Sequence, residues 1–591
     1  MSNGPNMGER AVFHLLFFMI VKVANCDYFE CREGPCVTTP MGRVFGRQVE
    51  SILGNGDLKR VDTYRGIPYA QPPIGDLRFA DPQPKTSWTG LLRATSYGKT
   101  CFGTIFKAGR SLGLRYAEMW NPPGNEAALA EDCLYLNIWT PTRNTQQSKP
   151  VMVWIYGGSF ITGSSSLWEY NGQFLSAAQD MVVVSFNYRV GALGFLKTRD
   201  GKIPGNLGLK DQQMALKWVH ENIHHFGGNN ATITLVGMSA GAASVGYHQL
   251  SQGSWGYYKS AVMNSGSPFA EWAYTSQDDI YDQSDQLLKQ LRCSEKDNLL
   301  QCLRSLSPLA IFEQDRDLKW APTVDGTFLT DTPKNLISKG KYNKVPLLIS
   351  LNKNEGSVFA YIKLGDRFTT RNGRLKPITL ERFRSNMDTI FPETPEAERD
   401  TAIDMYTQGI KSNGTALSLA VSEVIGDSSF VCPVLRWADD MTRGNHVYFL
   451  RLDYRSSIEE SPEWMGVLHG ADYQWTFGIP LDRDRNYQQR EIDLAEKYMK
   501  YLGNFIRTGD PNGGRLPNWY PFSGRQALCI QNNMSIASCD VMQRSRDRCW
   551  RWNAILGLSG SGTKAADFQL TSLLSVFTIL VISCRQLSRY F

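Results

Sequence analysis

One stretch of sequence decides the fold of this chain: Thr232-Ile233-Thr234-Leu235-Val236-Gly237-Met238-Ser239-Ala240-Gly241. Its first five residues predict a buried strand, and the residues from Ala242 onward predict a helix. Between them, G-x-S-x-G predicts a tight, strained turn that exposes the Ser239 hydroxyl. Side chains at Gly237 and Gly241 would clash in such a turn. The motif alone is common by chance, with an idle serine as the alternative, but its strand–turn–helix setting indicates a nucleophile.

Similar units recur on both sides of this stretch. The candidate strands are residues 151–156, 180–186, 345–351 and 447–452, and the candidate helices are residues 209–226 and 492–506. Fully apolar strands that alternate with helices predict a largely parallel sheet covered on both faces. Ligands of such sheets bind beyond the carboxyl ends of the strands. We therefore expect an α/β-hydrolase fold, with residues 37–552 as a single catalytic domain.

The bulk composition excludes several classes of function. The 591 residues are 42% hydrophobic, and a net charge of +6 is spread without long runs of one sign. This composition supports a large core and predicts no nucleic-acid surface. The sequence contains no paired C-x-x-C motif or similar ligand cluster, so we expect neither a metal nor a cofactor.

Both ends of the chain carry targeting patterns. Arg10 precedes an apolar run at residues 11–20, which predicts a signal peptide over residues 1–25. Twelve cysteines and the sequons at Asn230, Asn413 and Asn533 fit an exported, disulfide-bonded glycoprotein. Residues 559–591 combine small residues, a polar spacer and an apolar run, as in a GPI-attachment signal. A short single-pass anchor and a tail without function are the alternatives.

The nucleophile needs a base and an acid, which follow it in the order serine, acid, histidine. Of seven histidines, only His446 and His469 lie far enough downstream. His469 lies in a glycine-flanked loop that can present an imidazole, whereas His446 begins a strand and is expected to be structural. Glu355 directly follows the strand at residues 345–351 and is the expected acid. Asp325 is the alternative, although Val-Asp-Gly favours a turn.

The turn after the strand at residues 151–156 is the expected oxyanion hole. Backbone amides reach the developing negative charge only where side chains stand clear, and this turn carries Gly157 and Gly158. The candidate donors are the amides of Gly158, Ser159 and Ala240. Loss of one such donor raises the barrier by roughly 2.7–4 kcal/mol. A plain glycine turn is the alternative.

Taken together, these motifs resemble the cholinesterase branch of the type-B carboxylesterases. The likeness extends from about residue 37 to residue 552 and rests on residues 131–139, 187–191, 205–212, 237–241, 352–357 and 464–470. The resemblance implies that Ser239, Glu355 and His469 form the catalytic triad. It also implies the disulfides Cys101–Cys133, Cys293–Cys302 and Cys432–Cys549. Cys529 and Cys539 could add a local bridge, while Cys26, Cys31 and Cys36 remain unassigned.

One matching segment concerns the substrate. Residues 118–122, Glu-Met-Trp-Asn-Pro, match the cholinesterase segment whose tryptophan holds the quaternary ammonium of the substrate. That cation cannot donate ordinary hydrogen bonds, so an indole face attracts it instead. The resemblance thus implies that Trp120 binds the substrate; the alternative is that Trp120 only packs its loop.

The chain also departs from the cholinesterase pattern. Met238 replaces the glutamate that usually precedes the nucleophile, and Ser159 replaces the third glycine of the oxyanion segment. Val358 and Ile161 stand where an aromatic residue and a tyrosine are expected. Leu318 and Trp272 fall near acyl-pocket positions.

We expect from this resemblance a serine hydrolase that cleaves choline esters such as acetylcholine, with weaker selectivity for the cation than is typical. The alternatives are a general carboxylesterase for uncharged esters and a cholinesterase-like adhesion protein without catalysis. The expected partner is a small ester. The tail allows attachment to a membrane through a lipid anchor, and the chain could form a homodimer outside the cell.

Overall fold

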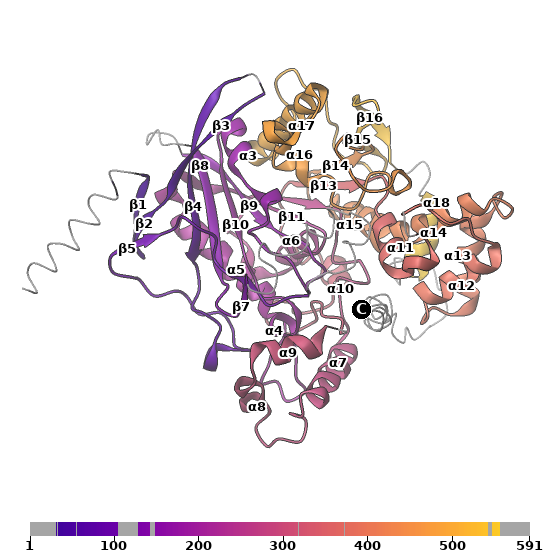
Figure 1. Ribbon diagram of the computed structural model, residues 1–591, viewed down its shortest axis with the longest axis horizontal. Helices are drawn as coiled ribbons and strands as arrows, with labels where there is room; N and C mark the ends of the chain where they lie inside the picture. Colours follow the sequence, from indigo (N-terminus) through magenta and orange to yellow (C-terminus); the bar gives the residue numbers. More distant parts are fainter. Residues whose placement is uncertain are drawn as a thin grey trace, which may run out of the picture.

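A sheet of eleven strands organises the part of the chain that the structure describes (Figure 1). The computed structural model describes residues 31, 34–54, 56–104, 128–141, 148–316, 318–370, 373–541 and 546–555. The predicted leader at residues 1–25 and the tail at 559–591 lie outside these ranges. From one edge to the other, the strands are β16 (Ile536–Asp540), β15 (Gln526–Ile530), β14 (Val447–Leu452), β13 (Leu347–Asn352), β12 (Ser260–Asn264), β11 (Gly228–Met238), β9 (Lys149–Ile155), β10 (Val182–Phe186), β8 (Tyr135–Pro141), β4 (Leu58–Pro68) and β3 (Arg47–Ile52).

The central strands of this sheet are parallel, and its edges are antiparallel. Every neighbouring pair from β10 through β9, β11, β12, β13 and β14 to β15 runs parallel. At one edge β16 is antiparallel to β15, and at the other β8, β4 and β3 are antiparallel to their neighbours. The largely parallel sheet that the sequence predicts is confirmed. The carboxyl ends of β9, β11, β12 and β13 therefore meet at one edge.

Helices cover both faces of the sheet. Every side chain of β10, β12 and β13 is buried, which requires packing on each side. Helices α3 (Gln173–Gln179) and α17 (Gln489–Thr508) pack against strands β8, β9 and β11, and α5 (Leu207–Asn222) and α6 (Ala240–Leu250) pack against β9, β11 and β12. In Figure 1, α3 and α17 lie above α5 and α6.

Several element boundaries differ from those expected. Strand β11 begins at Gly228 rather than at Thr232, because a register shift after Gly228 lets it pair with β9 earlier. Asp180 belongs to the end of α3, where it adopts a left-handed φ of 50°, and the strand begins two residues later. Helix α17 extends past the apolar pattern to a capping box at Gln488 and a left-handed Gly509.

A mainly helical region lies to the right of the sheet in Figure 1. It comprises α11 (Ser357–Leu364), α12 (Leu380–Ile390), α13 (Glu396–Thr407), α14 (Gly414–Gly426), the π-helix η8 (Asp427–Val431), α15 (Cys432–Met441) and α18 (Arg546–Ile555). Among the described residues, only the continuous helix Gly414–Met441 is long and apolar enough to cross a membrane. Most of it is buried in the fold, so it is a core helix.

Below the sheet, α7 (Gln277–Gln290), α8 (Leu299–Ser305) and α9 (Pro308–Asp315) form a second helical group, and α10 (Pro333–Ser338) follows it in the chain (Figure 1). A small separate sheet, β1 (Cys36–Thr39), β2 (Gly42–Phe45) and β5 (Leu91–Arg93), lies at the amino-terminal side.

The predicted disulfides are confirmed. The structure contains Cys101–Cys133, Cys293–Cys302 and Cys432–Cys549, and it contains the local bridge Cys529–Cys539 as well. Cys31 and Cys36, which the sequence left unassigned, also pair. Cys26 lies outside the described residues. Five disulfides indicate folding in an oxidising compartment.

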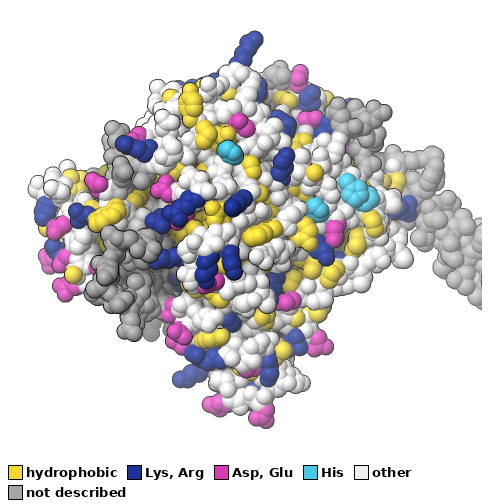
Figure 2. Space-filling model, turned by 180° about the vertical axis from the view of Figure 1, so that it is seen from behind, with side chains coloured by type: hydrophobic (Ala, Val, Ile, Leu, Met, Phe, Trp, Pro, Cys, Tyr) yellow, Lys and Arg dark blue, Asp and Glu magenta, His cyan; other side chains and the backbone are white. Residues whose placement is uncertain are grey.

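The surface is compatible with the predicted glycosylation, which remains a prediction. Asn230, Asn413 and Asn533 are all exposed. The side-chain oxygen of Asn413 caps α14 by accepting the Ala416 amide, which leaves its amide nitrogen available for attachment. Acidic, basic and apolar side chains all occur on the face shown in Figure 2.

Candidate active site

Ser239 occupies the sharp turn between β11 and α6. Its φ of +58° lies in a region that side-chain-bearing residues rarely adopt, and its amide donates to the carbonyl of Asn264 at 2.8 Å. A Cβ on Gly237 would lie 2.2 Å from the Gly241 oxygen, and one on Gly241 would lie 2.0 Å from the Ile155 oxygen. Both flanking positions thus require glycine, as the sequence predicts. The turn places the serine at the carboxyl edge of the sheet.

Glu355 and His469 meet at the same edge. Glu355 follows β13, and Nδ1 of His469 lies 2.6 Å from its Oε2. Both side chains are buried. A carboxylate can only accept a hydrogen bond, so Nδ1 carries the hydrogen and donates. In a neutral imidazole Nε2 then bears the lone pair.

Further polar groups hold Glu355 in place. Its Oε1 accepts hydrogen bonds from the Ser265 hydroxyl and from the Asn352 amide, each at 2.6 Å. The Asn352 side chain also donates to Asp472, which accepts from the Ser350 hydroxyl at 3.0 Å. Burial, and then the charge of Glu355, raises the pKa of Asp472 to about 6. We call Ser265, Asn352, Glu355, His469 and Asp472 the acid–histidine cluster.

The segment after β12 ties this cluster to the nucleophile turn. Ser265, which donates to Glu355, has a φ of +55° and follows the Asn264 carbonyl that accepts the Ser239 amide. A Cβ on Gly266 would lie 2.2 Å from the Ser239 carbonyl oxygen. The ends of β11, β12 and β13 therefore bring Ser239, Ser265 and Glu355 together.

Aromatic rings line the imidazole. The ring of Phe430 lies 4.4 Å from that of His469, and Phe359 lies 5.2 Å from it, measured between centroids. Phe430 also contacts Trp272, whose indole nitrogen donates to the Ser429 carbonyl at 2.9 Å. Phe430 and Ser429 belong to η8, so this π-helical turn carries the ring that contacts the imidazole. Apolar rings around His469 exclude water from it.

The expected oxyanion segment lies next to the nucleophile turn. Gly158, Ser159 and Phe160 have φ values of +119°, +54° and +61°. A Cβ on Gly158 would lie 2.4 Å from the Thr162 oxygen, so this position also requires glycine. Among the described residues, no backbone carbonyl accepts a hydrogen bond from the amides of Gly158, Ser159 or Ala240. Three amides without backbone acceptors fit a site for a negatively charged oxygen.

Comparison with known proteins agrees with this geometry. Residues 33–550 match the sequence model of the Carboxylesterase family. The chain belongs to the carboxylesterase family. It is 38% identical to the Cholinesterase of Mus musculus over 88% of this chain and 87% of the relative. It is 35% identical to the Acetylcholinesterase of Bungarus fasciatus over 88% and 86% of the two chains. The fold of this carboxylesterase is therefore the α/β-hydrolase fold, and its activity is that of a carboxylic ester hydrolase.

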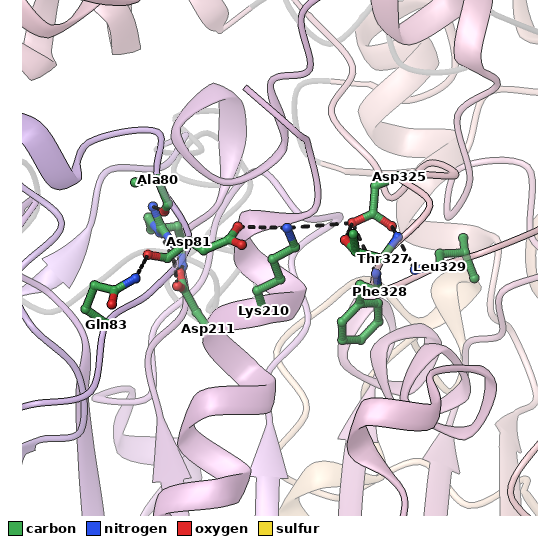
Figure 3. A network of polar contacts seen from close by, with 10 residues as sticks. Ala80, Asp81, Gln83, Lys210, Asp211, Asp325, Thr327, Phe328 and Leu329 are labelled. Carbon is green, nitrogen blue, oxygen red and sulfur yellow. Dashed lines mark hydrogen bonds and ion pairs between the residues drawn. The ribbon is translucent and has the colours of Figure 1, made fainter. Parts of the chain in front are cut away.

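The alternative acid and base in this carboxylesterase, Asp325 and His446, lie where structural roles are expected. Asp325 accepts the Leu329 amide at 2.8 Å and the Thr327 hydroxyl at 2.8 Å, which closes its own turn (Figure 3). Lys210 lies between Asp325 and Asp81. His446 is exposed at the start of β14. These contacts agree with a turn role for Asp325 and leave Glu355 as the acid that contacts an imidazole.

A second buried histidine of the carboxylesterase, His248, differs from His469 in its hydrogen-bond partners. His248, in α6, contacts the Ser254 hydroxyl and the Gln212 side-chain oxygen. Burial without a carboxylate partner lowers its pKa to about 3. His248 therefore packs as a neutral group.

The departures from the cholinesterase pattern lie in the core of the site. Met238 is fully buried, and Val358 is 2% exposed. Trp120, the expected cation-binding residue, lies outside the described residues.

Sequence reasoning missed three polar residues of the cluster. Ser265 and Asn352 are single residues that become important only because β12 and β13 are neighbours. Asp472 was detectable, since an acidic residue three positions after His469 places a carboxylate close to the imidazole loop. Phe359 and Phe430 could not be identified as site residues from the sequence, because each only continues an apolar helix face.

Proposed function

We propose that this carboxylesterase hydrolyses small esters through an acyl-enzyme on Ser239 and that choline esters are among its substrates. The observation that carries the proposal is the 2.6 Å hydrogen bond from His469 to Glu355 at the strand edge that also holds the strained Ser239. This arrangement provides a nucleophile, a general base and an orienting acid.

The proposed reaction has two halves, formation and hydrolysis of the acyl-enzyme, and the same groups act in both. Nε2 of His469 takes the Ser239 proton as Oγ attacks the ester carbonyl carbon. The resulting oxyanion accepts hydrogen bonds from the amides of Gly158, Ser159 and Ala240. Collapse breaks the bond to the alcohol, which leaves with the proton from His469. Water, deprotonated by His469, then attacks the acyl carbonyl carbon. The bond from that carbon to Ser239 Oγ breaks, Oγ takes the proton back from His469, and the acid leaves. Glu355 stabilises the imidazolium in both halves.

The names of two relatives, Cholinesterase and Acetylcholinesterase, support choline esters as substrates. The match of residues 118–122 to the cholinesterase segment supports Trp120 as the ligand of the ammonium group. One indole contributes about 0.5–2 kcal/mol toward a cation, which is at most about thirtyfold in affinity. The preference for a cationic alcohol should therefore be modest.

A general carboxylesterase for uncharged esters is the second candidate, and Met238 favours it. The side chain before the nucleophile is apolar and fully buried, so it contributes no negative charge toward a cation. Such a pocket favours neutral alcohols.

Two measurements test the proposal: the first distinguishes an esterase from an adhesion module, and the second distinguishes choline esters from uncharged esters. An organophosphate should label the protein and block its activity, and Ser239→Ala should abolish labelling; a labelled variant would refute Ser239 as the nucleophile. The absence of labelling in wild-type protein would favour an adhesion module. Next, kcat/KM for acetylthiocholine should exceed that for its uncharged isostere, and Trp120→Ala should reduce the difference. Equal constants for both esters would reject the choline proposal.

We also propose that the protein acts outside the cell. The five disulfides and the three exposed sequons support this location. The GPI anchor and the homodimer remain predictions. Release of the protein from cell surfaces by a phosphatidylinositol-specific phospholipase would support the anchor, and retention would reject it.

A further inference from the structure

Three ionisable side chains gather beside Trp272, away from the acid–histidine cluster. Glu271 precedes Trp272, Lys319 follows Leu318, and Lys363 lies near the end of α11. Glu271 Oε1 accepts the Ser429 hydroxyl at 2.7 Å, and Lys319 donates to the Glu271 carbonyl at 3.0 Å. We call Glu271, Lys319, Lys363 and Ser429 the lysine cluster.

The lysine cluster adjoins the wall of the active site. Phe359 and Lys363 are four residues apart on α11 and therefore share a helix face. Phe359 stacks on Phe430, and both rings contact His469. Ser429, which bonds to Glu271, directly precedes Phe430, so the lysine cluster and the imidazole contact consecutive residues of η8.

Lys363 is a buried amine whose Nζ has no hydrogen-bond acceptor in the described part of the chain. The residue is 8% exposed, and its Nζ has no hydrogen-bond partner among the described residues. Oε2 of Glu271 likewise has none among them. Buried polar groups are nearly always hydrogen-bonded, because leaving one unpaired is costly. A group that stays unpaired at the edge of an active site indicates a ligand.

The electrostatic field at Lys363 favours an anion as that ligand. Burial lowers the pKa of Lys363 to about 7, Glu271 opposes this shift, and Lys319 adds to it. Burial also lowers the pKa of Lys319 and raises that of Glu271. The cluster thus holds two basic side chains and one acidic side chain, and an added anion would favour the charged form of Lys363. The negative charge of Asp279 raises the pKa of Lys319, but the Asp279 carboxylate already accepts a hydrogen bond from the Ser276 hydroxyl at the start of α7.

We infer that Lys363, supported by Lys319, binds a carboxylate at the far end of the acyl group of the ester substrate. A substrate carboxylate would supply the acceptor that Nζ lacks and would balance the second positive charge. The acyl group is assigned because Trp272, which directly follows Glu271, has its ring 6.5 Å from that of Phe160 in the oxyanion segment, where the ester carbonyl is proposed to bind. The inference rests on the proposed ester hydrolysis and specifies its acyl substrate class.

The test compares two umbelliferyl esters, the hexanoate and the monoester of hexanedioic acid, which differ by one terminal carboxylate. The ratio of kcat/KM for the acidic ester to that for the neutral ester should fall at least about tenfold in Lys363→Met, because buried hydrogen bonds between charged groups are strong. The ratio should rise in Glu271→Gln, which removes a repelling charge. Lys217→Met, the same exchange at an exposed position of α5, should leave the ratio unchanged.

The outcomes separate this inference from the proposed function. If neither ester is hydrolysed and no organophosphate labels Ser239, ester hydrolysis itself is wrong. If the neutral ester is hydrolysed and neither substitution shifts the ratio, the carboxylate site is wrong. A merely structural role would slow both esters alike and leave the ratio constant. Dependence on Lys363 found only for esters with a carboxylate on the alcohol would overturn the acyl assignment.

Discussion

The two clusters that contact η8, through Phe430 and through Ser429, use similar groups in different ways. In the acid–histidine cluster, Glu355 accepts three hydrogen bonds and is fixed toward one imidazole nitrogen. In the lysine cluster, Nζ of Lys363 and Oε2 of Glu271 have no hydrogen-bond partner among the described residues. A saturated cluster preorganises a reaction, whereas an unsaturated one is suited to take up a ligand.

The largest difference between the clusters should appear when a carboxylate loses its charge. Glu355→Gln should lower kcat about 10⁴-fold, because the amide no longer stabilises the imidazolium and favours the wrong tautomer. The same change at Glu271 should alter acyl selectivity without abolishing turnover. Steady-state kinetics on the neutral ester measure turnover, and the ratio of kcat/KM for the acidic and the neutral ester measures selectivity. Glu381→Gln, at an exposed position of α12, is the matched control. Near-normal turnover by Glu355→Gln would break the comparison.

The lysine cluster should destabilise the fold in the absence of substrate. The folded-state pKa of Lys363, about 7, lies below its ordinary value of 10.5, so charged Lys363 is disfavoured in the fold. Lys363→Met should therefore be more stable than wild type by about 3–5 kcal/mol at neutral pH, and the gap should close as the pH approaches 10.5. Denaturant unfolding at several pH values measures this gap. A less stable variant at neutral pH would contradict the prediction.

Asp472 should show the opposite dependence on pH. Its folded-state pKa of about 6 lies above its ordinary value of 3.8, so the stability that it contributes is present below pH 4 and is lost as the pH rises through 6. Asp472→Asn should match wild type near pH 4 and exceed its stability by about 3 kcal/mol above pH 6. Unfolding curves across this range test the sign, and a gap that shrinks with rising pH would refute it.

The smallest effect concerns one hydroxyl. Ser265→Ala removes one of the three hydrogen bonds to Glu355, so kcat/KM should fall about fivefold, which corresponds to about 1 kcal/mol. Ser338→Ala, an exposed serine of α10, serves as the control. A loss of several hundredfold would show that Ser265 takes part directly in proton transfer.

The sequence predicts the acid–histidine cluster better than the lysine cluster for a physical reason. Ser239 lies in a local motif, and Glu355 and His469 follow it in a fixed order in loops. Each could be identified from neighbours in the chain. Glu271, Lys319 and Lys363 lie in separate segments without a shared pattern, and only the packing of η8 against Trp272 and α11 brings them together.

The same distinction applies to the fold. Apolar runs predict the central strands, because those strands are buried on both faces. The ends of strands and helices depend on strand pairing and on caps, as at Gly228 in β11 and at Gly509 after α17, and the spacing of apolar residues does not show these features. The Cys31–Cys36 disulfide is local, yet the spacing of Cys26, Cys31 and Cys36 in the sequence does not show which two of them pair.

The π-helical turn η8 makes the active site sensitive to chain length at one point. A π-turn holds one residue more than an α-turn, and each residue of an α-helix rotates the next by about 100°. Deleting Ser428 would restore a regular helix from Gly414 into α15 and swing the Phe430 ring away from His469. The catalytic side chains would all remain, but the imidazole would be opened to water by a change in helical phase alone.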